Sequence, residues 1–329
     1  LGVEKRYLHE FDVSAPFFDS LRVGYDGFNE WYQRSCQSQR ECWCITDEQD
    51  ELLALCIFKA ENSPEVTDDR KSLSGRVLKL CTLKVGEDIR GRKIGERLLY
   101  TAFTYAVEEN FDWVYMHSNS SVHEHLIDLC TDYGFKLYGS YAGDDVYSKP
   151  MRIHLLEEPE SNLDYAIQYY PNYRMNASVP CFIIPMQTAF HEDLFPDISD
   201  FSNSLFANDP NFYNPQSNTI KKAYICHANI SSIPSGALLL FYRTQDRKSI
   251  EVVGIAERSI RTSDINVAMT MIAKRTVFSY DQISEKLQKP ALIILFRLVK
   301  YIPAINRSDM QSAGIEARFK VFADLTLRI

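Results

Sequence analysis

The sequence predicts two domains: an α/β (α+β) domain with a mixed central sheet and helices on both faces, then a second, β-rich domain. A chain of 329 residues is too long for one ordinary core. Strand-like and helix-like segments alternate in the first half, whereas the second half carries mainly short apolar runs. We predict a first domain at residues 1–153, a connector at 154–178 and a second domain at 179–329.

The elements of the first half follow from the spacing of its apolar residues. Aromatic residues at near-helical spacing predict one or two short helices within 17–33. Alternating apolar residues on both sides of a polar turn predict a hairpin, 41–46 with 51–61. The elements predicted after it are a strand at 77–85, a helix at 94–109, a strand at 113–119, a helix at 123–133 and strands at 135–138 and 145–149. This order predicts a mixed sheet with a parallel core.

The second half predicts a small closed or half-open barrel, because short strand-like runs predominate over helical periodicity. One helix is expected from Ser279, an N-cap serine followed by a glutamine three residues later. The strand-like runs are 180–185, 223–228, 237–243, 251–260, 291–302 and 317–329.

The two halves differ in charge. Residues 1–170 carry 18 Lys and Arg against 30 Asp and Glu, a net charge of −12. Residues 171–329 carry 18 against 14, a net charge of +4. This asymmetry predicts different partners for the two halves, although +4 falls short of a typical strong polyanion binder.

The eight cysteines contain no C-x-x-C pair and no zinc-site spacing with histidines, so we expect no metal. They are expected to be reduced thiols in a reducing compartment. No apolar run approaches the roughly 20 residues of a membrane span, and no secretory signal is recognisable at the start. We therefore expect a cytoplasmic protein without a membrane partner; the oligomeric state is left open.

The segment that carries chemistry is LKLCTLKVGEDIRGRKIGERLL, residues 78–99. A strand ends, a glycine-containing loop follows, and a helix begins near Ile94. The unpaired N–H groups and the positive dipole end of that helix form an anion site. Gly91 and Gly95 permit close approach of a ligand to the backbone. Positive side chains stand beside the same amides: Arg90, Arg92 and Lys93. A diphosphate is the expected ligand.

This segment resembles the acetyl-CoA signature of the GNAT acetyltransferase family, Arg/Gln-x-x-Gly-x-Gly/Ala after a strand that ends in Val85. The departure is Lys93, where the family usually has its first glycine; a side chain is tolerated there if φ is negative. The resemblance covers the first half and includes Gly134 after the last helix. It implies that backbone groups of Leu83 and Val85 pair with the pantetheine arm. It also implies that the pyrophosphate is held by the amides of Arg90, Gly91, Arg92, Lys93, Ile94 and Gly95, with Asn119 near the cofactor.

The resemblance also bears on the proton donor. Many family members use a tyrosine four residues before the glycine of Gly-Phe, a position that Cys130 occupies here, while Tyr133 lies nearby. Other candidate donors are Tyr138 and Tyr141. For the base that takes the amine proton, the candidates are Glu61, His117 and Glu87. Whether the domain turns over at all is left open.

From about residue 221 onwards the chain resembles the PUA-like superfamily, which includes ASCH and EVE modules. That resemblance implies binding of RNA or a modified nucleic acid. The candidate contacts are Arg243, Lys274 and Arg275, then Arg297 and Lys300, with Phe241, Tyr242 and Phe278 as stacking surfaces. The alternative is that the aromatic residues belong to the core and the basic residues to solvated faces.

Three functions are therefore weighed. The first is an acetyl-CoA-dependent N-acyltransferase of unknown acceptor amine, with an RNA-linked or nucleoprotein substrate presented by the second domain. The second is a non-catalytic module that binds CoA and reads modified nucleic acid. The third is a toxin or phage-defence effector.

Overall fold

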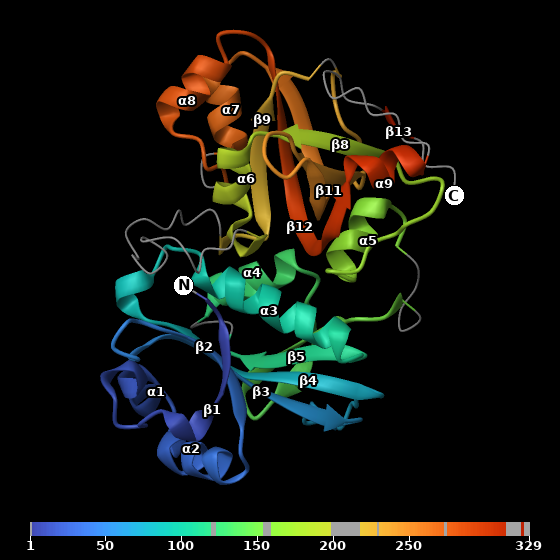
Figure 1. Ribbon diagram of the computed structural model, residues 1–329. Helices are drawn as coiled ribbons and strands as arrows, with labels where there is room; N and C mark the ends of the chain where they lie inside the picture. The colour runs from blue at the N-terminus through green and yellow to red at the C-terminus, as the bar shows by residue number, and fades with distance from the viewer. Residues whose placement is uncertain are drawn as a thin grey trace. The chain divides into compact units, whose positions relative to one another are not determined.

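The computed structural model describes residues 2–119, 123–153, 159–198, 218–228, 230–272, 275–313 and 324–325. The chain divides into two compact units, Leu1–Glu157 and Glu158–Ile329. In Figure 1 the first unit runs from blue to green and the second from green to red.

The first unit is built on one seven-stranded mixed sheet in the order β1-β2-β3-β4-β5-β7-β6. Strands β4 and β5 are parallel, and every other neighbouring pair is antiparallel. This arrangement confirms the predicted mixed sheet with helices on both faces. The strands are β1 (Glu4–Tyr7), β2 (Glu41–Thr46), β3 (Leu52–Asn62), β4 (Arg76–Val85), β5 (Trp113–Ser118), β6 (Lys136–Tyr141) and β7 (Asp144–Pro150).

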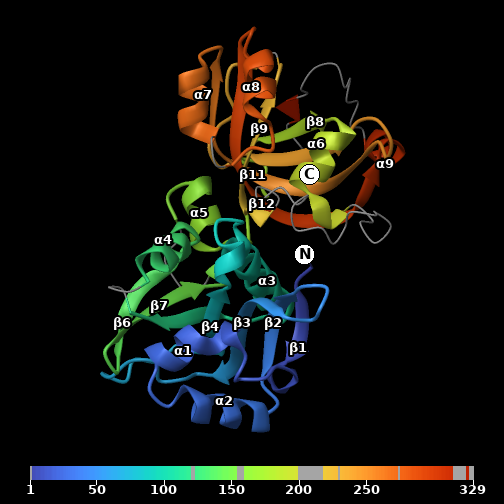
Figure 2. The same ribbon diagram turned by 90° about the vertical axis from the view of Figure 1, so that its left-hand side faces the viewer.

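Four α-helices cover this sheet, α1 (Asp19–Gly24) and α2 (Phe28–Gln37) on one face and α3 (Ile94–Glu108) and α4 (Glu124–Asp132) on the other (Figures 1 and 2). The face of α1 and α2 is closed by an aromatic cluster that includes Phe18, Phe28 and Tyr32. Strand β1 was not predicted, because its sequence EKRY has no apolar alternation. Its pairing with β2 forms it.

The second unit contains a six-stranded sheet in the order β13-β8-β10-β11-β12-β9. Strands β11 and β12 are long and their ladder shifts register three times, which bends a sheet towards a half-barrel. The β-rich half-barrel agrees with the predicted class. Its strands are β8 (Cys181–Met186), β9 (Lys221–Cys226), β10 (Leu238–Arg243), β11 (Ser249–Thr262), β12 (Ala291–Asn306) and β13 (Asp324–Leu325). Of the predicted strand at 317–329, all but residues 324–325 lies outside the described residues.

The second unit also contains more helix than the apolar runs predicted. Its α-helices are α5 (Asn162–Gln168), α6 (Thr188–Leu194), α7 (Ile265–Ile272), α8 (Tyr280–Lys286) and α9 (Arg307–Ser312). Helix α8 is the one predicted from the sequence, and Ser279 and Gln282 form its capping box. The others are short, and short helices give a weak periodic signal.

Part of the predicted connector is structured. Helix α5 lies within it, and Ala166 packs into an apolar cluster with Leu238 and Val299. The buried Tyr170 hydroxyl donates a hydrogen bond to the carbonyl of Leu298 at 2.6 Å. Residues 159–178 therefore belong to the second unit rather than to a free linker, and residues 154–158 lie outside the described part of the chain.

Candidate coenzyme site

Strands β4 and β5 separate inside the first sheet. Their pairing stops at Leu80 and Met116, although β4 continues to Val85. On its other side β4 remains paired with β3 as far as Val85. One edge of β4 from Cys81 onwards therefore faces no strand of the described structure. This edge includes Leu83 and Val85, and its backbone groups are placed to pair with an extended ligand.

A β-bulge accompanies the separation. The register between β3 and β4 shifts between Ile57 and Phe58, which oppose Thr82 and Leu80, so Cys81 is the inserted residue. A bulge bends its strand and changes the direction of the side chains that follow. The bulge therefore provides a physical reason why β4 leaves β5 just beyond Leu80.

The loop after β4 brings the start of α3 to the same place. No side chain caps this helix in the described structure, so its first-turn N–H groups retain hydrogen-bonding capacity for an anion. A Cβ atom built on Gly95 would lie 3.8 Å from Leu83 Cδ2 and 3.9 Å from Val85 Cγ2. The helix start and the unpaired edge of β4 therefore adjoin and form one site.

The backbone of Lys93 does not have the negative φ that would let a side chain replace the usual glycine without strain. Its φ is 60°, in the left-handed region, rather than negative. The condition for tolerating a side chain without strain is therefore not met: the backbone keeps the conformation that a glycine would adopt, and Lys93 carries the strain of its Cβ. Gly91, with φ of 81°, shares this region of backbone space.

Positive charge gathers beside this loop. Arg90 forms an exposed ion pair with Glu87 at 3.3 Å. The pKa of Lys84, at the end of β4, is lowered by burial first and by the neighbouring charge of Arg90 second. A bound anion would relieve this repulsion. The sequence does not mark Lys84 as part of this positive cluster, because only the fold brings its ammonium group towards Arg90.

The end of β5 borders the separation from the other side. Asn119 follows the strand, and its carbonyl accepts a hydrogen bond from the N–H of His123 at 2.9 Å. His117 is half-buried, and burial first and Lys79 second lower its pKa to about 4. Its Nε2 atom is buried and has no hydrogen-bond partner among the described residues.

The other two candidate bases have partners. Glu61 accepts a hydrogen bond from the Tyr115 hydroxyl at 2.6 Å and pairs with Lys59 at 2.7 Å. Glu87 is highly exposed in its pair with Arg90. The exposed pair of Glu87 contributes little free energy, and Glu61 already has two partners, so neither carboxylate is marked by its surroundings as a base.

Neither Cys130 nor Tyr133, the first two candidate acids, is exposed. Cys130 is fully buried, burial raises its pKa to about 12, and its Sγ lies 3.8 Å from Met116 Sδ. Tyr133 is also fully buried, and its hydroxyl donates a hydrogen bond to Glu96. Both side chains fill the core between α3, α4 and the sheet, so the structure does not support either as the proton donor. Tyr138 donates to the carbonyl of Ser72 at 2.9 Å, and Tyr141 is 45% exposed.

One polar pair was not expected from the sequence. The hydroxyl of Tyr25, between α1 and α2, lies 3.3 Å from Nε2 of His123, and Asp144 contributes to raising the pKa of Tyr25 after burial. His123 occupies the N-cap of α4, but its side chain makes no capping hydrogen bond. Residues about 100 positions apart give no local signal of such a contact.

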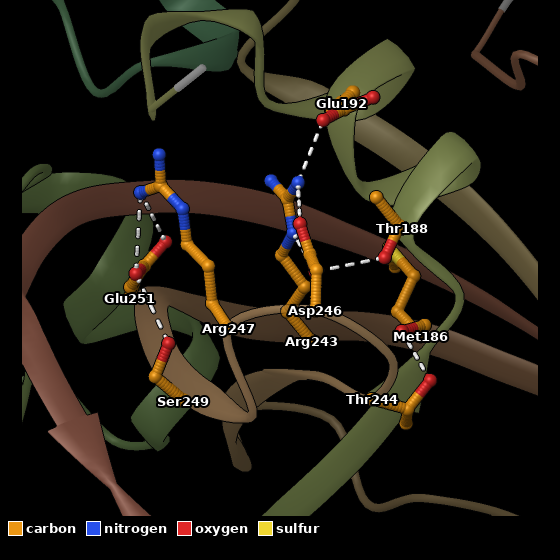
Figure 3. Close-up of polar contacts among 9 residues, drawn as sticks. All are labelled: Met186, Thr188, Glu192, Arg243, Thr244, Asp246, Arg247, Ser249 and Glu251. Atoms are coloured by element: carbon orange, nitrogen blue, oxygen red, sulfur yellow. Dashed lines mark hydrogen bonds and ion pairs between the residues drawn. The ribbon is translucent and has the colours of Figure 1, made fainter. Parts of the chain in front are cut away.

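In the second unit, the buried side chain of Arg243 binds two carboxylates (Figure 3). Its side chain is 4% exposed, and its Nε and Nη2 atoms bind the carboxylate of Asp246 while Nη2 also binds Glu192 at 2.6 Å. Thr188 donates to Asp246 at 2.9 Å. A contact of Arg243 with nucleic acid would break these bonds, so this assignment is not supported.

The remaining candidate contacts of the second unit are mostly internal. Phe241, Tyr242 and Phe278 are 0%, 3% and 5% exposed, so they belong to the core and the stacking assignment is wrong. Arg297 is buried in an ion pair with Glu257. The surface positions are Arg275, which is half-buried, and Lys300, which is exposed, whereas Lys274 lies outside the described residues.

Two further observations concern partners. Within the described ranges, no group of three or more His, Cys, Asp or Glu side chains is arranged to hold a metal ion. None of the described helices combines the length and the apolar character needed to cross a membrane.

Comparison with known proteins finds a family to which the first unit is similar. Residues 7–135 match the model of the acetyltransferase (GNAT) family. Similar solved structures include a putative acyl-CoA N-acyltransferase from Klebsiella pneumoniae, with 14% identity over 46% of this chain and 98% of that one and a TM-score of 0.32. A GNAT family acetyltransferase from Elizabethkingia anophelis with acetyl-CoA bound has 11% identity, coverages of 45% and 97%, and a TM-score of 0.32. ASCH from Zymomonas mobilis has 15% identity, coverages of 44% and 87%, and a TM-score of 0.32. A search of curated proteins found no match.

The match of residues 7–135 and the mixed sheet with its separated strands agree. Residues 7–135 of the first unit are therefore similar to the GNAT acetyltransferase family, whose members use acetyl-CoA.

Proposed function

We propose that this chain is an acetyl-CoA-dependent N-acyltransferase. The observation that carries the proposal is the unpaired edge of β4, which leads directly to the uncapped start of α3. An extended arm with amide groups would complete the hydrogen bonds of that edge at Leu83 and Val85. A diphosphate at its end would meet N–H groups of Gly91, Lys93, Ile94 and Gly95, whereas those of Arg90 and Arg92 already donate to the carbonyls of Glu87 and Ile89. Pantetheine joined to a diphosphate has this order of groups.

The chemistry follows from this placement. An acceptor amine attacks the thioester carbonyl, the C–S bond breaks, and CoA leaves as a thiolate that must be stabilised and protonated. We further propose that the second unit presents an RNA-linked or nucleoprotein acceptor. Its net charge of +4 over residues 171–329 supports that role.

Calorimetric titration with acetyl-CoA tests the coenzyme site. In the double variant Arg90→Ala, Gly95→Trp, the indole would collide with the ends of Leu83 and Val85, and we expect affinity to fall by about 10²-fold or more. Val107→Trp, at an exposed position near the far end of the same helix, is the matched control and should bind normally. Retained affinity in the double variant would contradict the assignment.

A second candidate function is non-catalytic binding of CoA, coupled to recognition of modified nucleic acid. The burial of both Cys130 and Tyr133 favours it. Incubation with labelled acetyl-CoA and cell extract separates the two functions. Thermal stabilisation by CoA without label transfer would identify a binding module, since a ligand stabilises the folded state by mass action.

A further inference from the structure

The last residues of β5 carry two buried polar groups that the fold leaves without partners. Ser118 is 4% exposed, and its Oγ atom has no hydrogen-bond partner in the described structure. The same holds for Nε2 of the preceding residue, His117. An unsatisfied buried polar atom costs about 1–3 kcal/mol, so two in succession call for a physical explanation.

These two side chains point to opposite faces of the sheet, because successive residues of a strand alternate. Met116 touches Cys130 of α4, so Ser118, two residues on, shares the face of α3 and α4. His117 lies on the opposite face, where its ring is 5.6 Å from that of Tyr115 and 5.1 Å from that of Tyr141.

Both residues lie in the part of β5 that is no longer paired with β4. Met116 is the last residue of β5 that pairs with β4, and His117 and Ser118 follow it beside the gap. The gap is bordered on the other side by the edge of β4 from Cys81 to Val85. A thioester that lies along that edge therefore has Ser118 on one face of the sheet and His117 on the other.

We assign one tautomer to the ring of His117. The backbone of Val66 favours protonation of the ring as a hydrogen-bond partner, and Nε2 has no partner among the described residues. The proton is therefore assigned to Nδ1, towards Val66, which leaves the lone pair on Nε2. Burial and the charge of Lys79 hold the pKa of the ring low, so the imidazole is neutral at pH 7 and acts as a hydrogen-bond acceptor.

Resting on the proposed acyltransferase function, we propose that the end of β5 is where the two reactants meet, with Ser118 on the sulfur of CoA and His117 on the acceptor amine. Nε2 of His117 accepts one N–H of the neutral amine and directs its lone pair towards the acetyl carbonyl. The new C–N bond forms and the C–S bond breaks, with the electron pair leaving on sulfur. The Ser118 hydroxyl donates a hydrogen bond to that thiolate until it takes a proton from water, and the surplus proton of the amine passes to water.

The assignment of Ser118 is tested without an acceptor. Calorimetry compares CoA with desulfo-CoA, which lacks the sulfur, at a pH where the thiol of CoA ionises. We expect the wild-type protein to bind CoA about tenfold more tightly and Ser118→Ala to bind both equally. Ser35→Ala, at a buried serine on α2, is the control and should keep the preference. Equal affinities in the wild type would overturn the role of Ser118, whereas failure to bind either compound would refute the proposed function itself.

The assignment of His117 is tested with hydroxylamine as a small probe amine, with CoA release followed by chromatography. His117→Leu should raise KM for the probe about tenfold and leave acetyl-CoA affinity unchanged, while His117→Gln, whose amide oxygen can replace Nε2, should stay within about threefold. The control is His125→Gln, at an exposed histidine of α4. Unchanged KM in His117→Leu, or an enzyme that binds acetyl-CoA but gives hydroxylamine no acetyl group, would overturn the role of His117.

Stability separates a binding role of Ser118 from a structural one. Because the Oγ atom that Ser118→Ala removes is buried and has no partner among the described residues, this variant should keep or raise the melting temperature. His117→Leu also removes the Nδ1–H group assigned to Val66, so its melting temperature does not make this distinction. Loss of the preference for CoA together with lowered stability in Ser118→Ala would indicate that Ser118 supports the fold, and would overturn its proposed role.

Discussion

The two sheets of this protein differ in how completely their strands pair. In the first unit β4 loses its neighbour after Leu80, in the middle of the sheet. In the second unit, β11 and β12 stay paired from Ser249–Asn306 to Thr262–Ala291, and bulges absorb their curvature. Backbone groups left unpaired inside a sheet need another partner, which is why we propose the coenzyme site at this interruption. The continuous ladder of β11 and β12 offers none.

The buried polar side chains show a related contrast. At the end of β5, Ser118 and His117 Nε2 have no partner within the described structure, next to the proposed coenzyme site. In the second unit the buried Arg243 is held by two carboxylates. His191 differs from it, because both of its ring nitrogens are buried and have no partner among the described residues. If this contrast holds, substitutions of buried polar groups in the second unit should change the free energy of unfolding, whereas substitutions beside the coenzyme site of the first unit should change ligand affinity.

The largest expected effect concerns His191. Burial first and Arg243 second lower its pKa to about 4 in the folded protein, against about 6.5 unfolded. As pH falls from 6.5 towards 4, the unfolded chain binds a proton that the folded chain does not. Stability is therefore fully present above pH 6.5 and falls by up to about 3 kcal/mol below it. Urea unfolding at pH 7.5 and pH 4.5 should show a smaller loss in His191→Leu than in the wild type.

The control is His227→Gln, which removes an exposed histidine of the same unit and should preserve the wild-type pH dependence. An equal loss of stability in His191→Leu and the wild type would show that the buried ring does not control it.

A smaller effect is expected for Arg243→Ala. Removing the guanidinium leaves Asp246 and Glu192 facing each other, and because both carboxylates are about 40% exposed, water screens part of the penalty. We expect a loss of about 2 kcal/mol in the free energy of unfolding of the second unit. Acetyl-CoA affinity should not change. Arg258→Ala, at an exposed position, is the matched control. A loss confined to nucleic-acid binding would instead restore Arg243 as a contact residue.

Lys84→Ala tests the charge beside the coenzyme loop. The ammonium group and Arg90 repel each other until an anion lies between them, so the variant should bind acetyl-CoA about fivefold more weakly, close to 1 kcal/mol. Lys79→Ala on the same strand is the control: both lysines lie over an aromatic ring, Lys79 over Tyr115 and Lys84 over Phe17, but it is Lys84 whose pKa the charge of Arg90 lowers. Equal affinities of the two variants in calorimetry would place the anion elsewhere.

The smallest expected effect concerns two lysines whose backbones both lie in the left-handed region. Lys93 has φ of 60° and Lys248, in the turn between β10 and β11, has φ of 49°. Changing either to glycine should relieve strain and raise the free energy of unfolding by about 0.5–1 kcal/mol. Only Lys93→Gly should also alter acetyl-CoA affinity. An effect of Lys248→Gly on that affinity would contradict the separation of roles between the units.

The fold of the first unit could be predicted well from the sequence, because its helices and loops are marked by residues that are close together in the chain. The spacing of Leu98, Leu99 and Ala102 predicts α3, and the glycines at 91 and 95 mark the loop before it. In the second unit α6 and α7 were missed, because each is about two turns long and has too few residues for a clear period. Helix α8 was found from its capping box.

The side chains at the site were harder to predict. Cys130 and Tyr133 occupy positions that sequence similarity favours for an acid, yet the packing of α4 on the sheet buries both. Tyr25 and His123 meet only because a loop between two helices returns to the start of α4.

By itself the sequence predicted where an anion would be held, because a strand, a glycine-containing loop and a helix start follow one another in consecutive residues. Only the tertiary structure decided that β4 parts from β5 beyond Leu80, and that His117 and Ser118 stand beside the gap. Strand pairing joins residues that lie more than 30 positions apart, and its interruption depends on a bulge and on a neighbouring strand that no local pattern encodes.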